Sequence, residues 1–88
     1  KMLRVKKRNE FPIGSNYSML ANYFEDGEDA GIEVMLCKRT GYTLLVLELV
    51  YSQRGDKKDV RNRYEVICRN ISKSNEIFNK VEVSKNEF

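Results

Sequence analysis

The chain has 88 residues, of which 16 are Lys or Arg, 13 are Asp or Glu and none is His, so its formal net charge is +3. This length holds one small core, and we expect a single domain over residues 2–88, with Lys1 a remnant or fragment boundary. Hydrophobic residues at 41% and charged residues at 33% are typical of a globular domain. No apolar run approaches the ~18 residues of a membrane span, so we expect an intracellular protein of the cytoplasm or nucleus with no membrane association.

The first third of the chain predicts a strand and then a helix. Met2–Lys7 alternates weakly between polar and apolar residues, which is compatible with an extra N-terminal edge strand that ends before Pro12. A helix is then predicted from Ser15, a suitable N-cap, to Gly27, a C-terminal signal. Its apolar residues fall at the i, i+3, i+4 and i+7 spacing of one helix face. They are Tyr17, Leu20, Ala21 and Phe24.

The middle of the chain predicts three antiparallel strands, because it is rich in β-branched, aromatic and Leu residues. The strands are Ile32–Lys38, Tyr42–Ser52 and Asn62–Asn70. A three-residue hairpin ending at Gly41 would join the first two and pair Leu36 with Leu44. A charged, exposed loop, Gln53–Arg61, would join the second strand to the third. Thr43–Val50 is apolar on both faces, which predicts a central strand covered on both sides.

The C-terminal segment is compatible with two structures. A helix over about residues 73–82 is favoured, although Lys80–Ser84 also alternates like a strand. The predicted fold class is therefore α+β, in the order (β)-α-β-β-β-α. It is a small single domain in which a three-stranded antiparallel meander, with the N-terminal edge strand as an option, packs with one or two short helices.

The residues that usually carry catalysis are scarce. The lack of His removes the commonest general base and metal ligand, and no Gly-rich phosphate loop is present. Cys37 and Cys68 lack metal-ligand spacing and lie in apolar runs, as reduced structural thiols do. An acidic cluster between Glu25 and Glu33 is interpreted as a solvated loop and not as a cation site. We expect no enzyme activity, no cofactor, no metal and no small-molecule substrate.

The apolar sheet predicts a non-enzymatic protein-interaction or assembly domain. A sheet with two apolar faces and only short helices to cover them is expected to bury one face against a second copy or a larger protein. The candidate interface residues lie on one face of the predicted meander. They are Ile32, Val34, Leu36, Leu44, Val46 and Val50.

The alternative function is RNA or DNA binding. Phosphates reward Lys and Arg without requiring base contacts, and the chain has one basic stretch near its N-terminus and another in the predicted 54–63 loop. The candidate contacts, for a nucleic acid or an acidic partner, are Arg4, Lys6, Lys7, Arg8, Arg54, Lys57, Lys58, Arg61 and Arg63.

Overall fold

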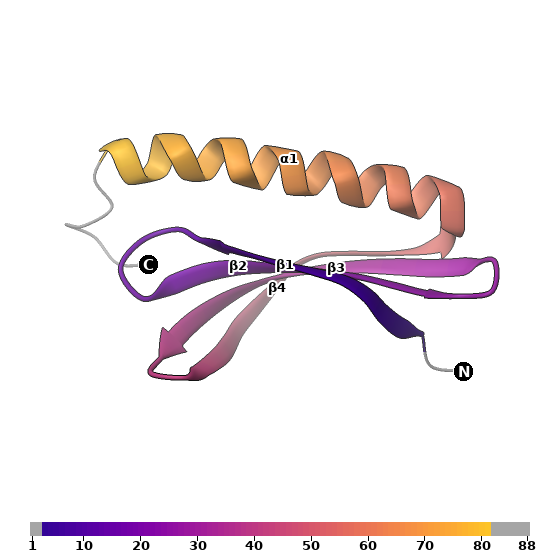
Figure 1. The fold of residues 1–88 in the computed structure, drawn as a ribbon, viewed down its shortest axis with the longest axis horizontal. Coiled ribbons are helices and arrows are strands. Elements are labelled where there is room, and N and C mark those ends of the chain that lie inside the picture. The colour runs from indigo at the N-terminus through magenta and orange to yellow at the C-terminus, as the bar shows by residue number, and fades with distance from the viewer. Residues whose placement is uncertain (1–2, 82–88) are drawn as a thin grey trace.

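The computed structural model describes the backbone of residues 3–81 and the side chains of residues 3–76. The elements are β1 (Arg4–Pro12), β2 (Tyr17–Asp26), β3 (Asp29–Thr40), β4 (Thr43–Asp56) and α1 (Lys57–Val81). The strands form one antiparallel sheet in the order β1-β2-β3-β4. The helix lies across one face of this sheet (Figure 1). The fold is therefore β-β-β-β-α.

The predicted order (β)-α-β-β-β-α is wrong first at residues 15–27, where the structure has a strand in place of a helix. Tyr17–Phe24 belongs to β2. The helical spacing of its apolar residues arises because the strand is buried on both faces. Ala21 and Tyr23 are buried on the face that carries α1, and Leu20 is buried on the opposite face. A strand with two buried faces loses the alternation that marks a half-exposed one.

The second error concerns the predicted loop Gln53–Arg61 and the predicted strand Asn62–Asn70. These residues form the end of β4 and more than half of α1. Asp56 caps the helix, since its Oδ1 accepts a hydrogen bond from the backbone N–H of Lys58 at 2.9 Å. The residues that face the sheet recur at helical spacing: Val60, Tyr64, Ile67, Cys68 and Ile71. The predicted helix over about 73–82 lies within α1 up to residue 81, and residue 82 is outside the described residues.

Two tight hairpins set the sheet register. Gly27 and Gly41 have φ of +62° and +63° at the first position of two-residue loops, where a type II′ turn requires glycine. Gly41 marks this turn as predicted, but it is the first residue of the observed loop and not the last. Leu36 pairs with Glu48 and not with Leu44, because the loop begins later in the chain than predicted and a bulge interrupts the β3–β4 ladder between Leu36 and Cys37.

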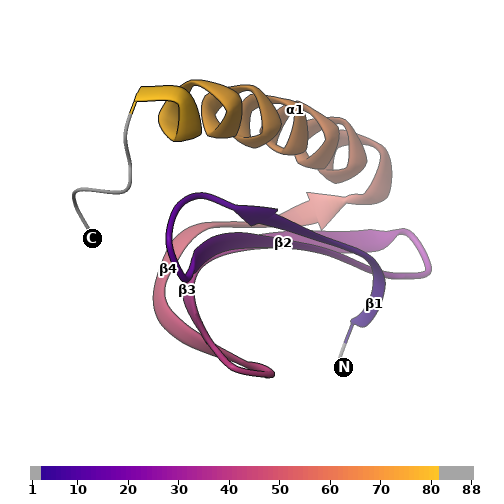
Figure 2. The same ribbon diagram turned by 60° about the vertical axis from the view of Figure 1, so that its left-hand side comes forward.

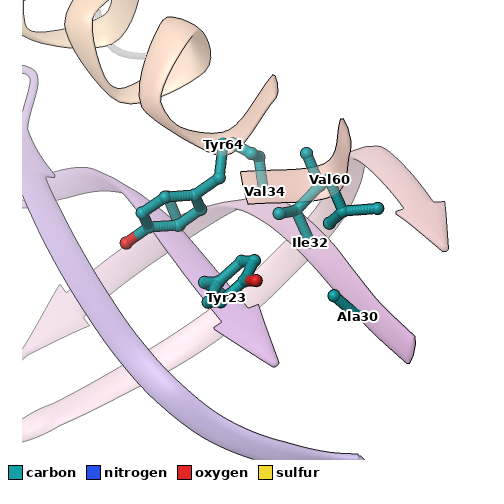
Figure 3. Packing of buried hydrophobic residues seen from close by; sticks show 7 residues of the cluster. Tyr23, Ala30, Ile32, Val34, Val60 and Tyr64 are labelled. Atoms are coloured by element: carbon teal, nitrogen blue, oxygen red, sulfur yellow. The ribbon is translucent and has the colours of Figure 1, made fainter. Parts of the chain in front are cut away.

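The core fills the space between α1 and the sheet (Figure 3). Tyr23 on β2 and Tyr64 on α1 pack with ring centroids 5.4 Å apart and planes at 54°, a tilted arrangement that aromatic pairs favour. Ile32 and Val60 are also buried beside them. Burial of these side chains holds the helix on the sheet, since an isolated helix has little stability of its own.

The sheet curls away from α1, so the face without the helix is concave (Figure 2). The β3–β4 hairpin bends away from α1 with this curl (Figures 1 and 2). Bulges bend strands and increase their twist, and the β3–β4 ladder is irregular between Val34 and Met35 and again between Leu36 and Cys37. This projecting hairpin is where the sheet lacks a cover.

Candidate functional site

Strand β4 is an edge of the sheet. It pairs with β3 on one side, and within residues 3–81 no strand pairs with it on the other. The prediction of a central strand covered on both faces at Thr43–Val50 is therefore wrong. The error arises because residues 62–70, predicted as a third strand, belong to α1 and do not pair with β4. An edge strand presents a row of free backbone N–H and C=O groups.

The side chains along this edge are apolar and exposed. The exposed fractions are 52% for Leu45, 51% for Val46, 47% for Leu47, 55% for Leu49 and 48% for Val50. Glu48 supplies the one charge in this run. We call residues 45–50 the β4 apolar segment. Scattered surface apolar residues are normal, but a contiguous group of this kind marks an interaction surface.

The β4 apolar segment is open on both faces of the sheet as well as at its edge. Leu45 lies opposite Lys38 of β3, whereas Val46 lies opposite Cys37, and neighbouring strand residues point to opposite faces. Both residues are about half exposed. The β3–β4 hairpin bends away from α1 as the sheet curls (Figure 2).

The opposite edge of the sheet, β1, is basic. Four of its exposed residues are cations: Arg4, Lys6, Lys7 and Arg8. Charged residues, and Lys above all, block the pairing of an edge strand with another strand, because pairing would desolvate them. The two edges of this sheet therefore differ: β1 carries cations, whereas β4 carries apolar side chains and has bulges at Leu47 and Val50.

The interface residues predicted from the sequence separate into three groups. Ile32 and Val34 are buried in the core under α1 and offer no surface to a partner. Leu36 and Leu44 are half-buried. Val46 and Val50 are exposed on β4. Leu45, Leu47 and Leu49 belong to the same apolar run and are exposed, although they were not among the predicted interface residues because the strand was expected to be covered on both faces.

The predicted basic contacts lie on β1, at the end of β4 and on the first half of α1. Lys57 and Arg61 both contact Glu25 of β2, with N–O distances of 3.1 and 3.5 Å. The hydrogen bond from Lys57 lowers the pKa of Glu25, and the charges of Lys57, Arg61 and Lys6 lower it further. The β2–β3 hairpin, which carries Glu28, also meets the start of α1, since Lys57 N–H donates to the Glu28 carbonyl at 2.8 Å. Acidic groups thus offset part of this basic surface.

Two of the remaining predicted cations, Arg8 and Arg63, form hydrogen bonds with neighbouring polar side chains. Arg8 Nε donates to Asn22 Oδ1 at 2.8 Å, and Arg63 Nε donates to the Tyr51 hydroxyl at 3.2 Å. Arg54 and Lys58 are exposed. The basic residues therefore spread over two strands and the helix, and they do not form one uninterrupted stripe.

A polar network lies on the concave face. Arg39 binds Glu10 through two hydrogen bonds, with Nη2–Oε1 at 2.5 Å and Nε–Oε2 at 3.2 Å. Ser18 also donates to Glu10 Oε2 at 2.8 Å. These hydrogen bonds, that of Arg39 first, lower the pKa of Glu10. The network joins β1, β2 and β3.

The cysteines are free thiols on opposite sides of the sheet layer. Cys37 is fully buried, and burial is the main cause that raises the pKa of its thiol. Cys68 lies on α1 and is half-buried. In the part of the chain that the structure describes, no group of three or more Cys, Asp or Glu is placed to hold a metal ion. In the same part, no helix combines the length and apolarity needed to cross a membrane.

No protein family model matches the chain, and neither curated proteins nor solved structures give a significant match. The surface geometry of the chain itself therefore carries the functional argument.

Proposed function

We propose that this chain is a protein-interaction module that binds a protein strand along the open edge of β4. The observation that carries the proposal is the β4 apolar segment, residues 45–50, whose apolar side chains are about half exposed on an unpaired sheet edge. Strand addition at such an edge is a recurrent mode of protein recognition, in which backbone hydrogen bonds give affinity and alternate side chains give specificity.

The energetics favour an apolar partner strand. Burial of apolar surface contributes roughly 25 cal/mol for each Å² removed from water, and Leu45, Leu47 and Leu49 each have about half of their surface available. The free N–H and C=O groups of β4 lie beside these side chains. One added strand can therefore form backbone hydrogen bonds with β4 and also cover its apolar side chains.

Nucleic-acid binding has weaker support. Its proposed contacts include Lys57 and Arg61, which already form ion pairs with Glu25. The chain has a net charge of only +3, and dedicated nucleic-acid binders have a stronger and more concentrated positive charge. By contrast, the apolar side chains of the β4 apolar segment remain about half exposed.

Selection of binding peptides tests the proposal without a known partner. A library of random ten-residue peptides is displayed and selected on the protein, with a Leu47→Lys/Leu49→Lys variant for counter-selection. We expect extended apolar peptides that bind the parent and lose binding to the variant. A Val66→Lys variant is the matched control, since Val66 is 40% exposed but lies on α1, and it should retain binding.

Two results would contradict the proposal. One is a selection that yields no peptide sensitive to the β4 substitutions. The other is salt-dependent binding of duplex RNA or DNA that persists in the β4 variant while peptides fail to bind, which would favour the nucleic-acid function.

A further inference from the structure

We infer that the partner strand is an acidic peptide segment. Two of its carboxylates, three residues apart, meet Arg54 and Arg63 on opposite faces of the sheet, and an apolar residue lies beside them. This inference rests on the proposed function and names the chemistry of its partner. It is supported by the regular part of β4, by the backbone groups that this part leaves free, and by the cations that flank it.

The regular part of β4 lies at its C-terminal end. Bulges at Leu47 and Val50 interrupt the strand, and from Tyr51 to Asp56 each residue again pairs with one residue of β3. A bulge disrupts the ladder and bends the strand. Tyr51–Asp56 is therefore the longest stretch of this edge that offers a regular template to an added strand, and it directly follows the β4 apolar segment.

The free backbone groups of this stretch follow from the β2–β3 hairpin. Asp29 closes its two-residue loop, so it forms a hydrogen-bonded pair with β2. Hydrogen-bonded and non-hydrogen-bonded pairs alternate along an antiparallel ladder, so Gly31 and Glu33 also bond to β2 and not to β4. Arg54 and Ser52 lie opposite these two residues. The N–H and C=O groups of Ser52 and Arg54 therefore point out from the open edge.

An arginine flanks this stretch on each face of the sheet. Tyr51 packs against the core on the face that carries α1. There the Arg63 guanidinium lies 5.9 Å from the centroid of the Tyr51 ring and donates a hydrogen bond to its hydroxyl at 3.2 Å. Arg54 points to the opposite, concave face, because side chains alternate along a regular strand. Both arginines are exposed, and among residues 3–76 neither forms an ion pair.

An added strand contacts these two cations from alternate side chains. Its residue opposite Arg54 points to the concave face, and its residue opposite Tyr51, three positions away, points to the face that carries Arg63. A carboxylate at each position gains a charge-assisted hydrogen bond with a guanidinium group, whereas a lysine or arginine there meets a like charge. Beyond Val50 the added strand meets Leu49, which is 55% exposed and favours an apolar residue.

Peptide selection tests this motif with a variant that blocks the edge and leaves the surface charge unchanged. Ser52→Pro removes an N–H that points away from β3, so the sheet keeps its own hydrogen bonds while the open edge loses a donor. Ser52→Ala is the matched control, since it keeps this N–H. We expect peptides that bind the parent and Ser52→Ala, fail to bind Ser52→Pro, and carry Asp or Glu at two positions three residues apart.

Isothermal titration calorimetry with one selected peptide tests the two arginines. Arg54→Gln and Arg63→Gln should each raise the Kd by about two- to five-fold, as the loss of an exposed ion pair does. Arg69→Gln, the same change elsewhere on the exposed surface of α1, should leave the Kd unchanged. Replacing one peptide carboxylate by its amide should abolish the effect of Arg54→Gln alone, and replacing the other should abolish that of Arg63→Gln. Circular dichroism verifies that the variants are folded, and the arginine variants decide the matter should Ser52→Pro fail to fold.

The outcomes separate this inference from the proposed function. Peptides that depend on Leu47 and Leu49 but lack the acidic pair, or that bind equally well to both arginine variants, overturn the inference and leave the proposed function standing. A mutant cycle in which neither carboxylate couples to its arginine overturns the inference as well. If no peptide sensitive to the β4 substitutions is found, both fail.

Discussion

The hydroxyl of Tyr64 accepts a hydrogen bond from Nδ2 of Asn9 at 2.7 Å, and so joins α1 to the outermost strand β1 across 55 residues of sequence. Tyr64 is 97% buried, with only 3% of its surface exposed. Burial is the main cause that raises its pKa, because the phenolate would lose its hydration. The same side chain packs on Tyr23. Tyr64 therefore contributes to both the apolar core and the attachment of an edge strand.

Tyr64→Phe should lower the free energy of unfolding by about 1 kcal/mol, because it removes a hydrogen bond and leaves the Asn9 amide without this acceptor. Urea denaturation at neutral pH measures the change. Tyr42→Phe is the matched control, since Tyr42 is fully exposed in a turn and its variant should unfold like the parent. Equal stability of the Tyr64→Phe variant and the parent would show that the hydrogen bond makes no net contribution.

The Glu10–Arg39 pair should make stability depend on acid pH. The pKa of Glu10 is lowered in the folded state from its ordinary value of 4.5, so the folded chain holds this proton less tightly than the unfolded chain. The stabilisation is fully present above pH 4.5 and is lost as pH falls through the folded pKa. Glu10→Gln removes this contribution. We expect urea denaturation to show a gap between parent and variant at pH 7 that narrows by pH 3; a gap that does not depend on pH would contradict the assignment.

Substitution of Gly41 should destabilise the fold because of its backbone conformation, although there is room for a side chain. A Cβ at Gly41 meets nothing within 4 Å, but φ is +63°, which costs an L-residue roughly 1–2 kcal/mol. Gly41→Ala should lower the midpoint of thermal unfolding. Gly55→Ala is the control, since its Cβ would meet Val60 at an ordinary 3.8 Å and no positive φ is recorded there. If both variants lost the same stability, the turn argument would fail.

Glu48 should limit the binding of apolar peptides at the β4 edge. It is the one charge within residues 45–50, and its carboxylate loses hydration when a strand docks beside it. Glu48→Gln should therefore lower the Kd for a selected apolar peptide by a few-fold, as measured by isothermal titration calorimetry. Glu65→Gln, which makes the same change on the exposed surface of α1, should have no effect. Weaker peptide binding to Glu48→Gln would mean that the carboxylate makes a favourable contact with the peptide.

The turn at Gly41 and the apolar strand at 43–50 were predictable because they depend on local chemistry. Glycine is required where φ is positive, and Gly41 marks its hairpin in the sequence as it does in the structure. The strand tendency of β4 follows from its Leu and Val residues. Such signals need only a few neighbouring residues.

The type of element was harder to predict where two periodicities coexist. Residues 62–70 alternate through Tyr64, Val66 and Cys68, which indicates a strand, but Val60, Tyr64 and Ile67 also follow helical spacing. The choice is made by Asp56 as a cap and by the fit of the helical face on Tyr23. In β2, the reverse error arose because burial on both faces hides strand alternation.

The sequence by itself determined that an apolar strand lies near residues 43–50, that a turn precedes it, and that acidic and basic residues group along the chain. Only the tertiary structure decided that this strand is an edge, because that depends on which segment lies beside it. With residues 62–70 as a strand, β4 would be central and its Leu residues buried; with those residues in α1, the same side chains are exposed. The free backbone groups of β4, and with them the proposed interaction surface, are a consequence of pairing at long range that no local pattern records.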